Sequence, residues 1–541
     1  MPSFLSRTSP WRHWLAGGLL LGLLVVGLAI WRDYGMSYDA GQSRNIGMVS
    51  LRYVAEQLDP AFLATPAQQA LFEQYRDPLL WFADRDYGVA FELPVTLGER
   101  LLELPTNRAI YQYRHLCTFL VGWVGVLALY GLGKRRYHDW RWGLLAAALL
   151  VCSPRLFGEL FYNDKDAVFM ALCTVATYTA VRFVGRPTWG WAALHALACA
   201  IAIDVRLMAV LWPVATGGLL LWRQWAGDYG PRATRRLAGP AALYLLLLPA
   251  LVVALWPYLW SDPLGNFLTA LHNMSRFRWG MQVLYRGELI IPAPPPWHYL
   301  FKWIGITTPL LQLGLIVLGI GVVARQLARS RWLYQPGTDQ WQELLFLVLG
   351  VGPVVVVVAL RSVLYDGWRQ LYFVYPSLLL LGLRAAVALA RWARSHAGWA
   401  PAAAGVVLGA GLLTSAVQLV QLHPFQSLYF SVLAGPDFVH RYEQDYWGIS
   451  YGQGLRWIVA HDARPVLRVA TDQLMSSPLD LNRDLLPDSL QRRLQVVSDP
   501  AQANYYLGSY RWHPQDYDFP HKAADIRAGQ QQRILSIFAL R

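Results

Sequence analysis

"WGWAALHALACAIAIDVRLMAVLWPVATGGLLLW", residues 189–222, is an almost unbroken apolar run whose only charged residues are Asp204 and Arg206. As a single helix rising 1.5 Å per residue, it would be roughly 50 Å long, well beyond the hydrocarbon core of a membrane. The run therefore either folds back near Asp204 and Arg206 or crosses once with a severe tilt. This choice decides on which side of the membrane every later segment lies.

The composition of the whole chain is typical of a polytopic α-helical membrane protein. Of its 541 residues, 55% are hydrophobic and only 15% are charged, and 25 are tryptophan. This balance indicates that much of the apolar surface faces lipid. The formal net charge is +13, but the basic residues form short clusters between apolar runs rather than one basic face. We therefore expect membrane lipid, and no nucleic acid, among the partners.

Apolar length and charge predict the topology. Eleven membrane spans are expected, at residues 14–31, 113–133, 142–160, 166–184, 189–203, 206–222, 240–260, 304–324, 344–360, 371–390 and 401–420. A fold-back at Asp204 places six loops on one side, and these loops hold 17 Lys and Arg against four acids. The positive-inside rule makes that side cytoplasmic. The N-terminus is then cytoplasmic and the C-terminus lies on the outer face.

Two large segments are expected on the outer face. In the first outer loop, residues 32–112, apolar residues recur at helical spacing after Asp39, which predicts an amphipathic helix on the membrane surface. A second helical pattern runs through 66–76. In the tail, "VLRVATD", "QANYYLGSYR" and "RILSIFALR" alternate with helix-compatible segments and predict a small α/β domain. We therefore expect a membrane domain over residues 1–420 and a C-terminal domain over residues 421–541.

Charged residues lie next to several spans on the outer side. Asp39 follows the first span, and Asp164, Lys165 and Asp166 directly precede another. The first interpretation is helix capping, which Asn163, Asp164 and Asp166 would suit at the start of that span and Asp39 at the start of the surface helix. The motif "RSVLYDGWRQLYFVYP", residues 361–376, can likewise be an interfacial anchor. The alternative is that charges from three loops converge on one site at the membrane surface.

Six motifs together resemble a known family. The chain is similar to bacterial members of glycosyltransferase family 39, the protein-mannosyltransferase-like enzymes of the GT-C class. The resemblance rests on "YDAGQS", "SPRLFGELFYNDKDAVF", "WHYLFKWIGITTP", "LYDGWRQLYFVYP", "HPFQSLYFSVLAG" and "RYEQDYWGISYGQGLRWI", which follow one another along nearly the whole chain.

This resemblance implies a GT-C-like fold in a bacterial inner membrane with a periplasmic C-terminus. It also implies a polyprenyl-phosphate sugar donor, a catalytic acid in the first outer loop, and inverting transfer on the outer face. The chain departs from the family at Ala40, where a second acid is common, and at Asp164, where proline is common.

The chemistry of such a transfer suggests roles for particular side chains. The acceptor hydroxyl needs a base, for which Asp39 is the first candidate and Asp166 the second. The departing phosphate needs fixed cations, and the outer-face candidates are Lys165, Arg276, Arg278, Arg361 and Arg369. Further substrate contacts are expected from Asp164, Tyr365, Asp366, Trp297 and His298. Asp39 and Asp166 could hold a divalent metal, but no further ligands are apparent, so we predict no cofactor.

Neither the sugar nor the acceptor follows from the sequence. The acceptor can be a glycan, a lipid or a protein. Two other functions remain open, a transporter and a non-catalytic scaffold for envelope assembly. A transporter would place ionisable residues on broken helices near the middle of the bilayer, whereas Asp204 and Arg206 fall at an expected outer turn.

Overall fold

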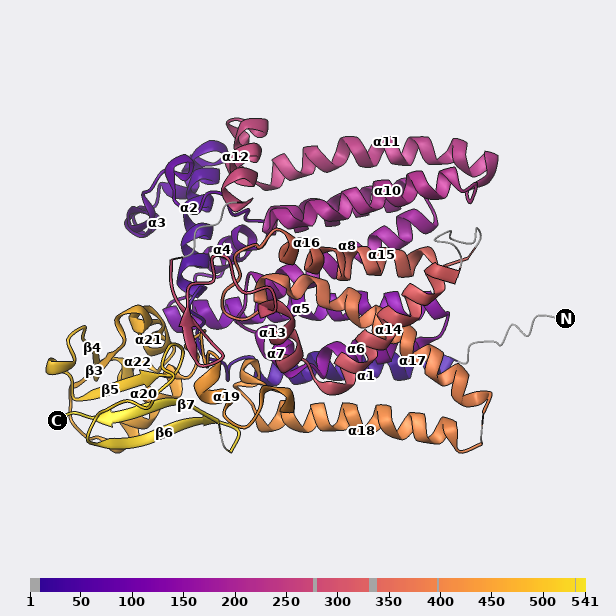
Figure 1. The fold of residues 1–541 in the computed structure, drawn as a ribbon. Helices are drawn as coiled ribbons and strands as arrows, with labels where there is room; N and C mark the ends of the chain where they lie inside the picture. The colour runs from indigo at the N-terminus through magenta and orange to yellow at the C-terminus, as the bar shows by residue number, and fades with distance from the viewer. Residues whose placement is uncertain (1–9, 276–279, 330–337, 397, 531) are drawn as a thin grey trace.

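The computed structural model describes residues 10–275, 280–329, 338–396, 398–530 and 532–541. Its largest part is a helix bundle in which the long helices run side by side (Figure 1). The bundle consists of α1 (Pro10–Ile30), α5 (Asn107–Tyr137), α6 (Trp140–Val151), α7 (Pro154–Glu159), α8 (Asp166–Gly185), α9 (Trp189–Val205), α10 (Leu211–Trp225), α11 (Gly230–Leu255), α13 (Tyr299–Thr307), α14 (Leu310–Arg329), α15 (Trp341–Gly350), α16 (Gly352–Ala359), α17 (Tyr375–Arg394) and α18 (Ala400–Gln421).

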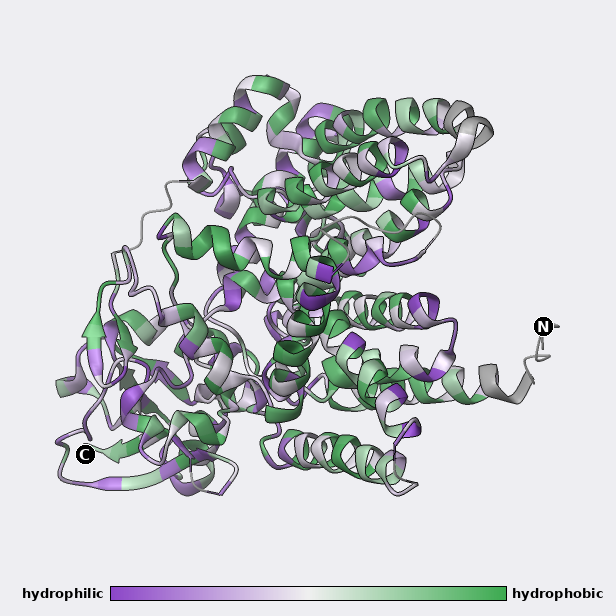
Figure 2. Cartoon of the chain, turned by 45° about the vertical axis from the view of Figure 1, so that its right-hand side comes forward, coloured by the Kyte–Doolittle hydropathy of each residue, from purple (hydrophilic) through white to green (hydrophobic). Residues whose placement is uncertain are grey.

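The bundle has the character of a membrane domain. Within the described residues, seven helices are long and apolar enough to cross a membrane, and α6, α9 and the apolar part of α1 are shorter. Many large apolar side chains of the long helices are exposed, and Figure 2 shows these helices coloured largely as hydrophobic. Because so much exposed apolar area is unfavourable in water, these helices suit contact with lipid. The chain is a multi-pass helical membrane protein.

The run at residues 189–222 forms two helices rather than one. α9 starts shortly after α8 ends, and Arg206, just past the end of α9, forms an ion pair with Asp166 at the start of α8. Near the end of α10, Arg223 donates to the backbone oxygen of Val184 near the end of α8, at 2.7 Å. The chain therefore runs along α8 in one direction and returns in the other, as the fold-back interpretation predicts.

Asp204 has a structural role at this reversal. Its carboxylate accepts a hydrogen bond from the backbone nitrogen of Val89, at 2.8 Å, and so ties the first outer loop to the end of α9. Gly88 allows this approach, because a Cβ atom there would lie 1.7 Å from the backbone oxygen of Asp204. A buried acid in an apolar run thus holds a loop in place.

Several predicted spans are interrupted. The expected span at 142–160 is wrong in its second half, because α6 ends at Val151 and Pro154 starts the separate helix α7. Proline has no backbone N–H to donate and its ring excludes the preceding turn, so the helix cannot continue through it. The expected span at 304–324 is likewise divided between α13 and α14 at Thr308 and Pro309.

The segments between the long helices gather at one end of the bundle (Figure 1). The expected surface helix after Asp39 is α2, and the pattern at 66–76 becomes α3 and a short 3-10 helix. Met48 and Leu51 of α2 are buried, whereas Leu58 is exposed. These segments contain α2 (Ala40–Leu58), α3 (Pro66–Phe72), α4 (Glu92–Leu101), α12 (Pro263–Ser275), β1 (Val283–Tyr285), β2 (Glu288–Ile290) and α19 (Phe438–Arg441).

The C-terminal residues form a mixed sheet with helices beside it, at the same end of the bundle (Figure 1). The strand order is β4-β3-β5-β7-β6, with β3 parallel to β4 and β5, and β7 antiparallel to β5 and β6. Strands β3, β5 and β7 lie in the three segments whose pattern predicts strands. The elements are α20 (Tyr451–His461), β3 (Leu467–Thr471), α21 (Ser476–Asp484), α22 (Asp488–Gln491), β4 (Leu494–Val496), β5 (Tyr505–Ser509), β6 (Lys522–Ala528) and β7 (Gln532–Ala539).

Candidate active site

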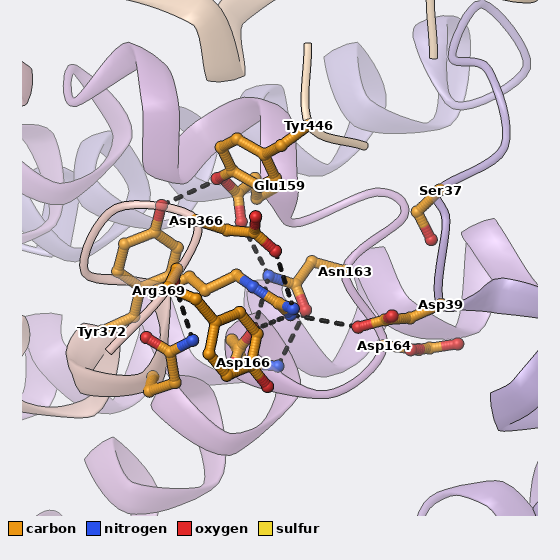
Figure 3. Close-up of polar contacts among 12 residues, drawn as sticks. Ser37, Asp39, Glu159, Asn163, Asp164, Asp166, Asp366, Arg369, Tyr372 and Tyr446 are labelled. Atoms are coloured by element: carbon orange, nitrogen blue, oxygen red, sulfur yellow. Dashed lines mark hydrogen bonds and ion pairs between the residues drawn. The ribbon is translucent and has the colours of Figure 1, made fainter. Parts of the chain in front are cut away.

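One buried arginine joins three acids from distant parts of the chain. Arg369 opens a short 3-10 helix, Arg369–Val374, directly before α17. Its guanidinium donates to Asp39 Oδ2 at 3.0 Å, to Asp166 Oδ2 at 3.1 Å and to Asp366 Oδ2 at 3.1 Å. Figure 3 shows the three carboxylates around it. The charges of three loops therefore converge, and the interpretation of residues 361–376 as a simple interfacial anchor does not account for Arg369.

Two further arginines contact the acids around Arg369. Arg206 forms an ion pair with Asp166 at 2.5 Å, and Arg511 of the C-terminal residues donates to Asp366 Oδ1 at 2.8 Å. Asp166 and Asp366 are thus each held by two arginines, whereas Asp39 has Arg369 as its one ion-pair partner among the described residues. We refer to these six side chains as the Arg369 cluster, which consists of Asp39, Asp166, Arg206, Asp366, Arg369 and Arg511.

Asp39 is the most accessible acid of the Arg369 cluster. Its side chain is 23% exposed, against 1% for Asp166 and 3% for Asp366. Burial raises the pKa of Asp39, but the charges of Arg369 and Lys165 outweigh burial, so that this pKa lies below its ordinary value. Asp39 is therefore ionised at neutral pH and can be reached from outside the cluster.

The C-terminal residues help to position Asp39. Asn482 of α21 accepts from the backbone nitrogen of Met36 at 2.9 Å and donates to the backbone oxygen of Met36 at 3.1 Å. Next to it, Gly35 leaves no room for a side chain, because a Cβ atom there would lie 2.3 Å from the backbone oxygen of Ile449. The C-terminal residues therefore hold the segment that leads into Asp39.

The structure decides between capping and convergence for two of the acids. Asp39 occupies the N-cap position of α2, but its side chain makes no capping hydrogen bond and points to Arg369 instead. At the start of α8, it is Asn163 whose side-chain oxygen accepts from the backbone nitrogen of Asp166, at 2.8 Å. The side chain of Asp39 therefore makes no cap. At α8 the cap comes from Asn163, as the capping interpretation allows, and Asp166 lies in the first turn of the helix while its carboxylate also binds Arg369.

A second polar network lies beside the Arg369 cluster. Glu159 is fully buried and accepts hydrogen bonds from Tyr372 and Tyr446, each at 2.9 Å, and from Asn163 at 2.7 Å (Figure 3). The amide of Asn163 also lies 3.4 Å from the carboxylate of Asp166. The network connects α7, the 3-10 helix that begins at Arg369 and the C-terminal residues, and so fixes the loop that carries Asp166.

Three other predicted residues lie around the Arg369 cluster. The ring of Tyr365 is 5.0 Å from the Arg369 guanidinium. Asp164 is buried and accepts from Ser43 at 2.9 Å, and burial raises its pKa to about 6. Burial lowers the pKa of Lys165, but the charge of Asp39 and its neighbours outweighs burial, so that this amine stays protonated.

The remaining predicted residues do not join the Arg369 cluster. Arg361 and Trp297 line a cavity of about 450 Å³ beside the proline-rich segment. His298 lines another cavity of about 510 Å³, where it hydrogen-bonds Tyr285 at 2.7 Å. The predictions for Arg276 and Arg278 lie outside the described residues. Within the described residues, no three His, Cys, Asp or Glu side chains gather in a way that could hold a metal ion.

Arg206 and Arg511 belong to the Arg369 cluster but are not among the predicted site residues. For Arg206 the sequence does contain a signal, because a charge inside an apolar run usually needs a buried partner. Arg511 follows a strand and lies 145 residues after its partner Asp366, and no local pattern connects the two.

Comparison with known proteins bears on the family. A family model described as dolichyl-phosphate-mannose-protein mannosyltransferase matches residues 111–260, which include Asp166 and Arg206. This match confirms the resemblance to protein-mannosyltransferase-like GT-C glycosyltransferases. A search of curated protein sequences finds no match.

Solved structures show likeness over most of the chain. ArnT from Cupriavidus metallidurans in the apo state is 15% identical, with 97% of this chain and 98% of that chain covered and a TM-score of 0.49. The archaeal oligosaccharyltransferase AglB from Archaeoglobus fulgidus, in complex with an inhibitory peptide and a dolichol-phosphate, is 11% identical, with 93% and 70% covered and a TM-score of 0.49. Likeness at this level carries no information on substrates.

Proposed function

We propose that the chain is a membrane glycosyltransferase that moves a sugar from a polyprenyl-phosphate donor to an acceptor hydroxyl. The reaction takes place on the extracytoplasmic face of a bacterial inner membrane and inverts the anomeric centre. The observation that carries the proposal is the accessible, ionised Asp39 beside Arg369, in a chain that matches a mannosyltransferase family model.

Asp39 acts as the general base. As the acceptor oxygen attacks the anomeric carbon, the hydroxyl proton passes to the Asp39 carboxylate and a new carbon–oxygen bond forms. The bond from the anomeric carbon to the phosphate oxygen breaks, and its electron pair leaves with the phosphate. Attack opposite the leaving group produces inversion.

Arg369 and Lys165 stabilise the departing phosphate. Both are fixed cations next to Asp39, and charge-assisted hydrogen bonds to a phosphate are strong. Asp166 and Asp366 hold the Arg369 guanidinium in place from two sides. Asp166 is too enclosed to replace Asp39 as the base without movement of its neighbours.

The test is release of polyprenyl phosphate from a polyprenyl-phosphate sugar by purified protein in lipid. Asp39→Asn should retain folding and donor binding and lose roughly 10² to 10⁴-fold in rate, the range that general-base catalysis contributes. The matched control is Asp59→Asn, at the opposite end of α2, which should transfer sugar like the wild type.

The same assay separates the alternatives. A transporter or a scaffold for envelope assembly would release no polyprenyl phosphate under any of these conditions. If Asp39→Asn transfers sugar at an unchanged rate, the chain is still a transferase, but Asp39 is not its general base. The acceptor class, whether glycan, lipid or protein, is then found by supplying each to the active protein.

A further inference from the structure

A second group of cations shares no residue with the Arg369 cluster. Arg286, Lys302 and Arg441 line the open cavity of about 510 Å³ that also contains His298. We call it the Lys302 cavity. Basic and aromatic side chains dominate its lining, of which the other members are Tyr285, Trp297, Phe301 and Tyr442.

The three cations have no acidic partner in the described part of the chain. None of them forms an ion pair within the described residues, whereas His440, the residue before Arg441, lies in ion-pair range of Asp437 and Asp516. Burial, together with the charges of Arg441 and Arg286, lowers the pKa of Lys302. Like charges therefore crowd this cavity without compensation.

The backbone that presents Arg286 is unusual for an arginine. Arg286 and Gly287 form the two-residue connection between β1 and β2, with φ of 58° and 90°. Such a turn favours asparagine or glycine at its first position, because a larger side chain is strained at positive φ. Gly287 also donates to the backbone oxygen of Arg441 at 3.0 Å, which holds the two arginines close together. An arginine kept at a strained position indicates a use for its charge.

The surroundings of the Lys302 cavity suit a lipid. Trp297 and Phe301 are exposed at its rim. Lys302 donates to the backbone oxygen of Leu433 at 3.2 Å, and the side chains of Leu433 and Val432 are exposed as well. Exposed aromatic and apolar side chains next to basic ones are typical of the membrane interface. The helix that carries Lys302 also leads directly into the long apolar helix α14.

We propose that the Lys302 cavity binds the phosphate of an anionic lipid headgroup, as a site separate from the Arg369 cluster. Arg286, Lys302 and Arg441 contact the phosphate. The apolar part of the lipid packs against the exposed side chains at the rim, which are Trp297, Phe301, Val432 and Leu433. The inference does not depend on the proposed transferase activity, because it concerns binding alone.

The test is a binding competition with the full-length chain in detergent. Delipidated protein receives equal amounts of phosphatidic acid and phosphatidylcholine with the same acyl chains, and native mass spectrometry measures the bound lipid. The wild type should prefer phosphatidic acid. Lys302→Gln should weaken that preference by about threefold to tenfold, as expected for one charge contact at a partly exposed site. The triple variant Arg286→Asn, Lys302→Gln and Arg441→Gln should lose it.

Two controls make the outcome decisive. Arg468→Gln removes one exposed charge from β3 and should change nothing. Arg286→Asn suits the turn better than arginine, so it should retain or raise the thermal stability while weakening lipid binding. A triple variant that prefers phosphatidic acid as strongly as the wild type would overturn the site. Inorganic phosphate that competes at the same concentration as the lipid would overturn the lipid assignment in favour of the free ion.

Discussion

Replacement of Arg369 by glutamine tests how the Arg369 cluster controls its most accessible acid. Asp166 keeps Arg206 and Asp366 keeps Arg511, so both retain an ion pair in the variant. Asp39 loses its one ion-pair partner among the described residues and keeps only the more distant charges, chiefly that of Lys165. Of the three acids, Arg369→Gln therefore leaves only Asp39 without an ion-pair partner among the described residues.

The direction and size of the effect follow from the causes of the pKa of Asp39. Burial raises this pKa and Arg369 is the largest cause that lowers it, so without Arg369 the pKa rises. An opposite charge at contact distance generally lowers a carboxyl pKa by about 1–3 units. If Asp39 is the base, the acidic limb of the rate profile should move up by a similar amount. Loss of the phosphate contact should also lower the plateau rate, by roughly 10² to 10³-fold.

The assay is the release of polyprenyl phosphate, measured as kcat/KM across the acidic and neutral pH range for protein of matched thermal stability. The control is Arg464→Gln, which breaks the exposed pair with Asp462 and should leave the profile unchanged. An acidic limb that stays in place when Arg369 is removed would refute the coupling between Arg369 and Asp39.

Three further outcomes are expected. Burial raises the pKa of Asp164 from 3.8 to about 6, so the folded state loses stability relative to the unfolded state as pH rises from about 4 to about 6. Asp164→Asn avoids this loss. Its free energy of unfolding should therefore exceed that of the wild type by up to about 3 kcal/mol above pH 6, and by little at pH 4. Arg511→Gln should cost about 3 kcal/mol, because it removes one partner of the buried Asp366, and the further change Asp366→Asn should recover part of that loss. The expected topology puts Ser498 on the outer face and Ser395 in a cytoplasmic loop. In intact cells, an impermeant maleimide should therefore label Ser498→Cys and not Ser395→Cys.

The helices could largely be predicted because their signal is local. Apolar length marks a span wherever it falls, and the charges at Asp204 and Arg206 mark the break between α9 and α10. The break at Pro154 is also visible as a proline, but the apolar residues on both sides conceal it. Helix ends are set by such single residues, and composition averages over them.

The site could be predicted only in part because contact depends on tertiary packing. Asp39, Asp166, Asp366 and Arg369 lie beside spans that enter one membrane face, and the structure brings these four together. Arg511 reaches the cluster from a separate sheet, and its direction follows from how that sheet docks. The same limit applies to residues 297 and 298, which lie on the expected face but line other cavities.

The charge balance of the Arg369 cluster bears on the proposed mechanism. The three acids and three arginines of the cluster balance in formal charge. Arg369 stabilises the ionised form of Asp39, which leaves Asp39 a weak base. A donor phosphate adds negative charge and competes with Asp39 for the Arg369 guanidinium. If the phosphate offsets part of the charge of Arg369, the pKa of Asp39 should rise, and the carboxylate should become a stronger base. Binding of the donor would thus activate the base at the moment when an acceptor can react.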